Sequence, residues 1–162
     1  MIGQHAPTSE VERLAAQIAR LEERVGDLLR PTPLVRTYTP TLGGVTLGDG
    51  SIPVKRYTVD ENRWVDCDVV VAFGTTSAVT GRVTISLPVE AAPGAVPRAS
   101  AWFGDSGATN YQAFVTMDAT TAYLDALNAS TTYGSLAISG AGVPVALGNL
   151  DTIVLGIRYL AA

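Results

Sequence analysis

The chain contains very few of the residues that perform chemistry in most enzymes and metal sites. Its 162 residues include one cysteine, Cys67, and one histidine, His5. A lone cysteine excludes an intrachain disulfide and a cluster of thiolate ligands. Because the single histidine precedes the first helical pattern, a Ser-His-Asp triad cannot be assembled. We therefore predict a protein that is not an enzyme and that holds no cofactor and no metal ion.

Basic residues and long apolar runs are also scarce. Lys55 is the single lysine, and the net charge is −4. A nucleic-acid-binding protein needs a basic surface that neutralises phosphates, and the sequence has no basic stripe. The longest apolar run, residues 69–73, is far too short to cross a bilayer. The first residues, MIGQHAPTSE, lack the basic start and apolar core of a secretory signal. We expect a protein that is made in a cytoplasm, binds no nucleic acid and does not insert into a membrane.

The most informative pattern that is present is an apolar heptad repeat near the N-terminus. Its members are Val11, Leu14, Ile18, Leu21, Val25 and Leu28. Valine or isoleucine at every a position and leucine at every d position are typical of a coiled coil. The stripe is narrower than the apolar face of a helix that docks on its own domain. Ser9 and Glu12 fit a capping box, and Pro31 and Pro33 forbid continuation. We predict an oligomerising coiled-coil helix over residues 9–30.

The heptad pattern leaves the number of associating helices open. Valine or isoleucine at a with leucine at d favours two strands. Ala15 and Leu29 occupy e positions and widen the apolar stripe, which suits three strands. Residues 24–28 (RVGDL) resemble the start of a trimer-favouring pattern, although Leu29 replaces its final glutamate. We favour a homotrimer over a dimer on the basis of the second half of the chain.

The rest of the chain has the pattern of a β domain. Residues 1–8 form a leader or anchor peptide, and residues 31–33 (PTP) form a stiff, extended linker. After the linker, short apolar runs are separated by turn signals about every 8 to 12 residues. We therefore predict an all-β domain over residues 34–162, an antiparallel β-sandwich with a jelly-roll-like arrangement. The predicted strands are residues 34–39, 54–59, 63–73, 81–87, 99–103, 111–116, 122–127 and 152–159, and the breaks between them include 43–44 and 140–142.

Two carboxylates on one predicted strand form a candidate catalytic pair. Asp66 and Asp68 lie two residues apart, so they share one face of the strand. Two carboxylates spaced by two residues on one strand face could perform acid–base chemistry on a glycoside. The favoured alternative is a solvent-facing pair that flanks a buried Cys67. We assign no catalytic residue, because the neighbouring sequence holds nothing else catalytic.

Acidic loops and aromatic residues offer two further candidate sites. Loops at Asp49, Asp60 and Asp105 could bind calcium if two of them converged, but ordinary turn chemistry accounts for aspartate there. Aromatic side chains could instead form a surface that stacks on a carbohydrate, and they are more often core or interface residues in a β domain. We take three of them as a possible ligand or receptor surface: Trp64, Trp102 and Tyr111.

The β domain resembles one that is common in virion surface proteins of phages that infect actinobacteria. The likeness is carried by YTPTLGGVTLGDG at residues 38–50, RY at 56–57, WVDCDVVV at 64–71, GTTS at 74–77 and GRVTISLPV at 81–89. These proteins include minor tail proteins and small structural proteins. The resemblance implies a trimeric β-sandwich on a virion surface, with a coiled-coil stalk similar to those of other phage fibres. It carries over no catalytic residue.

The resemblance leaves the position on the virion open. Tail proteins with this domain are usually much longer and have dedicated domains that join the baseplate. Here about eight residues precede the stalk, a length that suits a peptide anchor on a capsid. We therefore expect a capsid decoration or short head-fibre protein whose partner is the major capsid protein. The alternatives are a minor tail or receptor-binding protein that recognises a host cell-wall glycan, and an enzyme that cleaves such a glycan.

Overall fold

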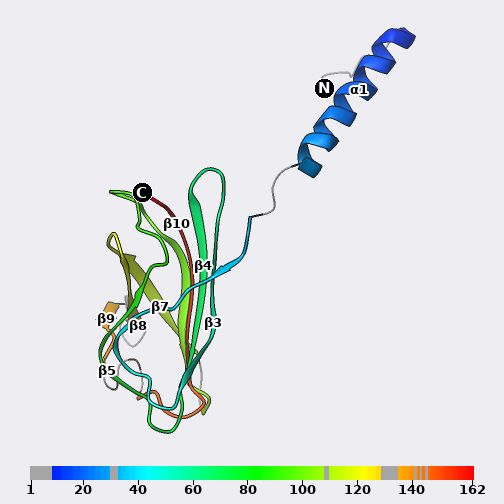
Figure 1. The fold of residues 1–162 in the computed structure, drawn as a ribbon. Coiled ribbons are helices and arrows are strands. Elements are labelled where there is room, and N and C mark those ends of the chain that lie inside the picture. The colour runs from blue at the N-terminus through cyan, green and yellow to red at the C-terminus, as the bar shows by residue number, and fades with distance from the viewer. Residues whose placement is uncertain are drawn as a thin grey trace. The chain divides into compact units, whose positions relative to one another are not determined.

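The structure, a computed structural model, describes residues 9–29, 33–107, 110–128, 135–140, 142, 144 and 146–162. The chain divides into two compact units, Met1–Thr32 and Pro33–Ala162. The first contains a helix and the second contains the strands (Figure 1). The predicted leader, with His5, and residues 31 and 32 of the predicted linker lie outside the described residues.

The first unit contains the predicted helix, α1, which spans Glu10–Leu29. Its N-terminus has the predicted capping box. The Ser9 backbone N–H donates to Glu12 Oε2 at 3.0 Å, and the Glu12 backbone N–H donates to Ser9 Oγ at 3.3 Å. These bonds satisfy two donors that the helix start leaves without an intrahelical partner. The helix and its cap are confirmed, and its association into a coiled coil stays a prediction.

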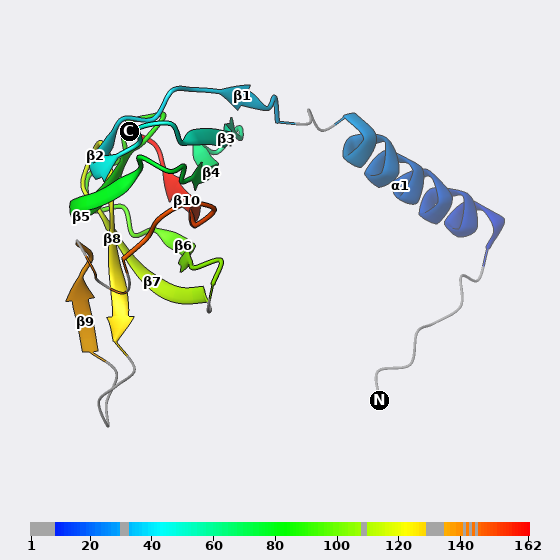
Figure 2. The ribbon, with the colours of Figure 1, turned by 90° about the horizontal axis from the view of Figure 1, so that it is seen from below.

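The second unit is a single antiparallel sheet, which confirms the all-β prediction. Its strands are β1 (Arg36–Thr37), β2 (Leu42–Thr46), β3 (Ser51–Val59), β4 (Trp64–Ala72), β5 (Ala78–Ser86), β6 (Arg98–Gly104), β7 (Asn110–Met117), β8 (Thr121–Asn128), β9 (Ser135–Ile138) and β10 (Thr152–Leu160). Their order is β1-β3-β4-β10-β6-β7-β8-β5-β2, and β9 pairs with β8. The sheet curls so that one face encloses the core (Figure 2).

The core follows from the alternation that the sequence shows. In β4, Val65, Cys67, Val69 and Val71 are buried, whereas Asp66 and Asp68 are exposed. In β10 the buried residues are Ile153, Leu155, Ile157 and Tyr159. Strands β5 and β8 supply Val83, Ile85, Ala122 and Leu124 to the same cluster. Because side chains alternate between the faces of a strand, the remaining residues form an outer face that meets solvent.

The segment between β1 and β2 bridges β3 and β5, which are far apart in the sheet order. The Tyr38 backbone N–H donates to the carbonyl of Lys55 in β3, and its hydroxyl donates to the carbonyl of Ser86 in β5 at 3.2 Å. The Ser86 backbone N–H donates to the carbonyl of Thr41 at 3.0 Å. Burial raises the pKa of the Tyr38 hydroxyl, so it stays protonated. This segment holds the curl of the sheet.

Two strands of the structure are absent from the sequence-based prediction, and β1 covers only Arg36–Thr37 of the strand predicted over residues 34–39. Strand β2 contains Gly43 and Gly44, where the sequence predicts a break. The register of β2 against β5 shifts between Gly43 and Val45, and Gly44 has a φ of 67°. A Cβ on Gly44 would collide with the carbonyl of Arg82. The two glycines therefore permit a bulge and a close approach to β5, and they do not end the strand.

Strand β9, also not predicted, pairs with residues 125–128 of β8, beyond the part of β8 that β5 covers.

Candidate functional site

The apolar seam of α1 is uncovered in the single chain. Each of its described members, Val11, Leu14, Ile18, Leu21 and Val25, has between 50% and 75% of its surface exposed. The side chain of Leu28, the sixth predicted member, lies outside the described residues. A continuous exposed apolar stripe marks an interaction surface. The seam is therefore one candidate functional surface, and its regular heptad spacing suits a partner helix of the same kind.

The outer face of β4 and β10 holds the two candidate carboxylates within a set of ion pairs. Arg56 Nε lies 3.0 Å from Asp68 Oδ2, and Arg158 Nε lies 3.8 Å from Asp66 Oδ1. More than half of each of these two aspartate side chains is exposed. The Arg158 guanidinium also lies over the Trp64 ring, 5.3 Å from its centroid. Each carboxylate thus faces solvent and an arginine, and the pair has no enclosed site around it.

A shallow cavity of about 380 Å³ lies beside these ion pairs. Gly156 in β10 forms part of its floor. A Cβ at Gly156 would meet only Asp68 Oδ1 and the carbonyl of Ser100, at 3.6 and 3.7 Å. Asp66, Arg98 and Arg158 are among the residues that line it. Positive and negative groups are mixed at its edge, so the cavity selects neither an anion nor a cation.

The structure does not bring the three candidate aromatic residues together. Trp64 and Trp102 both lie on the outer face, since Trp102 pairs with Val154 and Val154 pairs with Val70 in the strand of Trp64. Three register steps of two residues separate them, about 20 Å along the strands. Tyr111 lies on the opposite face and packs against the core. A surface made of all three side chains therefore does not form within one chain.

A groove that the sequence did not predict opens where β6 and β7 part. The two strands pair from Gly104↔Asn110 to Ala101↔Ala113. Beyond that point β7 continues to Met117 with β8 on its other side. Among the described residues, 114–117 of β7 have no strand partner on the side of β6. A cavity of about 530 Å³ lies there, and Val96 and Phe114 are large, exposed apolar residues in its lining.

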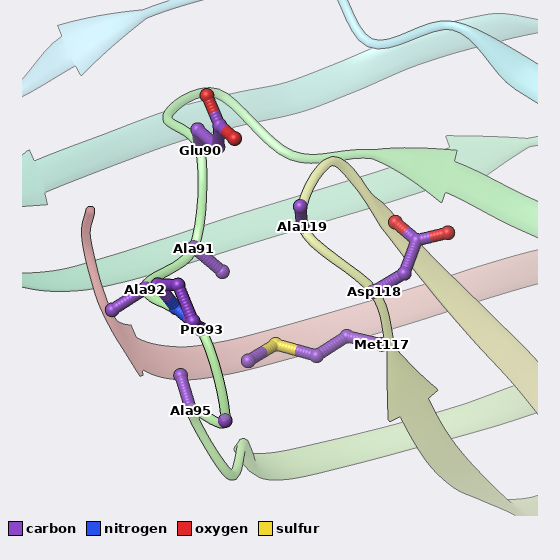
Figure 3. A pocket seen from close by; sticks show the side chains of 9 residues that line it. Glu90, Ala91, Ala92, Pro93, Ala95, Met117, Asp118 and Ala119 are labelled. Carbon is purple, nitrogen blue, oxygen red and sulfur yellow. The ribbon is translucent and has the colours of Figure 1, made fainter.

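The groove continues past Met117 into a second cavity of about 320 Å³, with Ala95 and Met117 lining both. Figure 3 shows the Met117 side chain extending toward the segment that contains Ala95. The carboxylates of Glu90 and Asp118 point away from that side chain (Figure 3). The groove is thus mainly apolar. One signal in the sequence could have located it, because Phe114 occupies an outward position in the alternating strand and is flanked there by Gln112 and Thr116.

The acidic loops have the structure of ordinary turns. Asp49 Oδ1 accepts bonds from the backbone N–H and hydroxyl of Thr76, and Asp49 Oδ2 accepts the same two bonds from Thr75. These bonds, the one from the Thr75 hydroxyl foremost, hold the pKa of Asp49 well below its usual range. Asp60 and Asp105 accept bonds from backbone N–H groups of their own turns. Each carboxylate therefore fixes a turn.

The described residues contain no cluster of three or more histidine, cysteine, aspartate or glutamate side chains that could hold a metal ion. Within the same part of the chain, no helix is both long and apolar enough to cross a membrane.

Comparison of the chain with models of protein families, with curated proteins and with solved structures finds no match.

Proposed function

We propose that the chain is a non-enzymatic structural protein of a phage virion, assembled as a homotrimer through the seam at residues 11–28. In this proposal α1 forms the coiled-coil stalk, and the β units decorate the capsid or form a short head fibre bound to the major capsid protein. The observation that carries the proposal is the exposed seam, a regular heptad with no cover in the single chain. The resemblance of residues 38–89 to virion surface proteins is the reason for proposing that the chain belongs to a virion.

Energetics favour association of the helix. Helices in proteins gain most of their stability from packing of their apolar face, so the 20-residue α1 needs a partner for its seam. Burying the large apolar side chains of the seam contributes on the order of 10 kcal/mol per chain before the entropic cost. The helix thus acquires its stability from the partner chains.

The β unit suits the exposed part of such a particle. In this proposal the curled sheet is a jelly-roll-like sandwich, with β3, β4 and β10 in one layer and β8, β5 and β2 in the other. The shared core of β4, β10, β5 and β8 supports that description. Charged residues on the outer face lie in short ion pairs, such as Arg56 with Asp68, and suit a surface that faces solvent.

Immunogold labelling of intact particles tests the position on the virion. The antibody is raised against residues 34–162 and applied to particles of the phage that encodes the chain, with particles that lack the protein as the control. Gold over the heads supports decoration of the capsid. Gold confined to the tail tip contradicts it. A second readout is the heat resistance of empty capsids, which bound protein should raise.

A receptor-binding protein of the tail is the second candidate, and one observation favours it. Trp102 is exposed on the outer face opposite Gln112, and the exposed Phe114 follows two residues further along β7. The two aromatic side chains project from the outer face on adjacent strands, at the point where these strands part. They could stack on a sugar of a host cell-wall glycan.

The two candidates make opposite predictions in a binding assay with host cell walls. If the chain is a receptor-binding protein, Trp102→Ala abolishes binding, whereas Leu150→Ala, at an exposed residue in a distant turn, preserves it. If the chain decorates the capsid, the wild-type protein does not bind the walls. The same incubation tests for cleavage of the glycan, since fragments that depend on Asp66 or Asp68 would contradict a structural role.

A further inference from the structure

The groove between β6 and β7 has the features of a site for an extended strand. Residues 114–117 of β7 lack a strand partner on that side among the described residues. In an antiparallel sheet, alternate residues direct both their N–H and C=O groups toward the same neighbour. The edge of β7 therefore offers backbone donors and acceptors to the groove. Apolar residues from 95–97 line the same cavity. An added strand would bond with the backbone edge of β7, and its apolar side chains would contact residues 95–97.

The chain carries a segment that matches this site. Leu34 and Val35 precede β1 and have 69% and 61% of their surface exposed. Neither residue is paired with another strand, because β1 pairs with β3 only at Arg36 and Thr37. Two consecutive, exposed large apolar residues next to a short edge strand are stabilised when the segment pairs with another strand.

The segment and the groove cannot meet within one chain. In the sheet order, β3, β4, β10 and β6 separate β1 from β7. Figure 2 shows β1 and β7 on opposite sides of the curled sheet. A contact between them has to join two copies of the chain.

The register places the segment and the groove at the same level of the sheet. Arg36 is aligned with Ala99 through the pairs Arg36↔Tyr57, Tyr57↔Cys67, Cys67↔Ile157 and Ile157↔Ala99. Continuing β1 backwards by one and two residues places Val35 level with Arg98 and Leu34 level with Pro97. Continuing the β6–β7 register in turn places these positions level with Thr116 and Met117.

The strand directions also agree. Each neighbouring pair from β1 to β7 is antiparallel, and five such steps make β1 antiparallel to β7. The segment of one copy can therefore pair with β7 of the next copy in the antiparallel sense. A contact between two different surfaces of the same chain closes into a ring when the rotation closes.

We propose that residues 33–35 of each chain add a strand to β7 of the next copy and place Leu34 and Val35 in its groove, so that three β units form a closed ring. This inference rests on the proposed trimer and deepens it by naming a contact between the β units. The contact fixes the β units to one another, whereas the seam fixes the helices.

Cross-linking between introduced cysteines tests the contact in the full chain. The test protein carries Val35→Cys and Val96→Cys, two positions that are exposed in the single chain. The matched control carries Val35→Cys and Leu150→Cys, since Leu150 is equally exposed but lies outside the groove. Cys67 adds little background, because it is buried and burial raises the pKa of its thiol to about 11. Each protein is treated with a short bismaleimide and analysed on a denaturing gel, and its mass before treatment is measured by light scattering.

The outcomes separate the contact from the trimer. The proposal predicts a trimeric mass for both proteins, and covalent trimers at least tenfold more abundant in the test protein than in the control. A trimeric mass with equal cross-linking in the two proteins overturns the strand contact and leaves the seam trimer standing. A monomeric mass for both proteins overturns the proposed assembly, and the contact with it.

Discussion

At the scale of single residues, Ser139 shows how one side chain completes the sheet. It is buried, its hydroxyl accepts a bond from the Val83 backbone N–H at 2.9 Å, and it donates to the carbonyl of Leu124. Val83 and Leu124 are the pair at which β5 ends its ladder with β8, and β9 pairs with β8 from the next residue on. The hydroxyl therefore satisfies backbone groups at the junction of three strands.

Replacing this hydroxyl leaves a buried donor unpaired. We expect Ser139→Ala to destabilise the β unit by about 1–3 kcal/mol, the cost of an unsatisfied buried polar group. Urea unfolding followed by tryptophan fluorescence measures it, because Trp64 and Trp102, the only tryptophans, both belong to the β unit. Ser100→Ala, at an exposed serine of β6, is the control and should change stability little. Equal effects of the two substitutions would argue against the role of Ser139.

Asp49 joins two turns through its four bonds with Thr75 and Thr76. Because the folded pKa of Asp49 lies below the unfolded value of 3.8, its charge stabilises the fold above about pH 4. That stability is lost as the pH falls below 3.8 toward the folded pKa. We expect Asp49→Ala to lower the melting temperature at neutral pH, by an amount that shrinks below about pH 4. Asp105→Ala serves as the control, since its carboxylate bonds to the backbone N–H of Gly107 in its own turn. A deficit that stayed constant down to pH 2 would contradict the role of the Asp49 charge.

At the scale of elements, the sequence predicted what depends on local periodicity. The alternation of Val65, Asp66, Cys67, Asp68 and Val69 placed each residue on its observed face of β4, and the heptad predicted α1 with its cap. Strand β2 was missed because the role of its two glycines depends on the distance to β5, which local sequence does not encode. The groove was missed for a related reason. The parting of β6 from β7 is a property of the paired strands, and only the outward position of Phe114 hinted at it.

Substitution of Gly26 tests the heptad register of α1 through the thermal stability of the helix. It lies at a solvent-facing b position of the heptad, and a Cβ there would meet no other atom within 4 Å. Glycine inside a helix is less favourable than alanine by about 1 kcal/mol. We therefore expect Gly26→Ala to raise the thermal midpoint of the helical signal in circular dichroism, and Ala19→Gly at the preceding b position to lower it. If Gly26→Ala lowered the midpoint, position 26 would face a partner chain and the assigned heptad register would be wrong.

At the scale of the whole molecule, the chain presents two apolar surfaces that a single copy leaves uncovered. The seam of α1 faces solvent along its described length, and the groove beside β7 lies open while Leu34 and Val35 are exposed elsewhere on the β unit. In the proposed assembly, further copies of the same chain cover both surfaces. The proposed phage setting rests on that assembly together with the resemblance.

The mass of the chain in solution, measured by sedimentation equilibrium, tests the proposed assembly most directly. We predict three times 16.9 kDa for the wild type and 16.9 kDa for Ile18→Asp/Leu21→Asp, which places two charges in the seam. The matched control, Ala16→Asp/Ala19→Asp, adds the same charge at the same spacing on the solvent-facing side of the helix and should keep the trimeric mass. A monomeric wild type, or an oligomer that survives the Ile18→Asp/Leu21→Asp change, would contradict assembly through the seam.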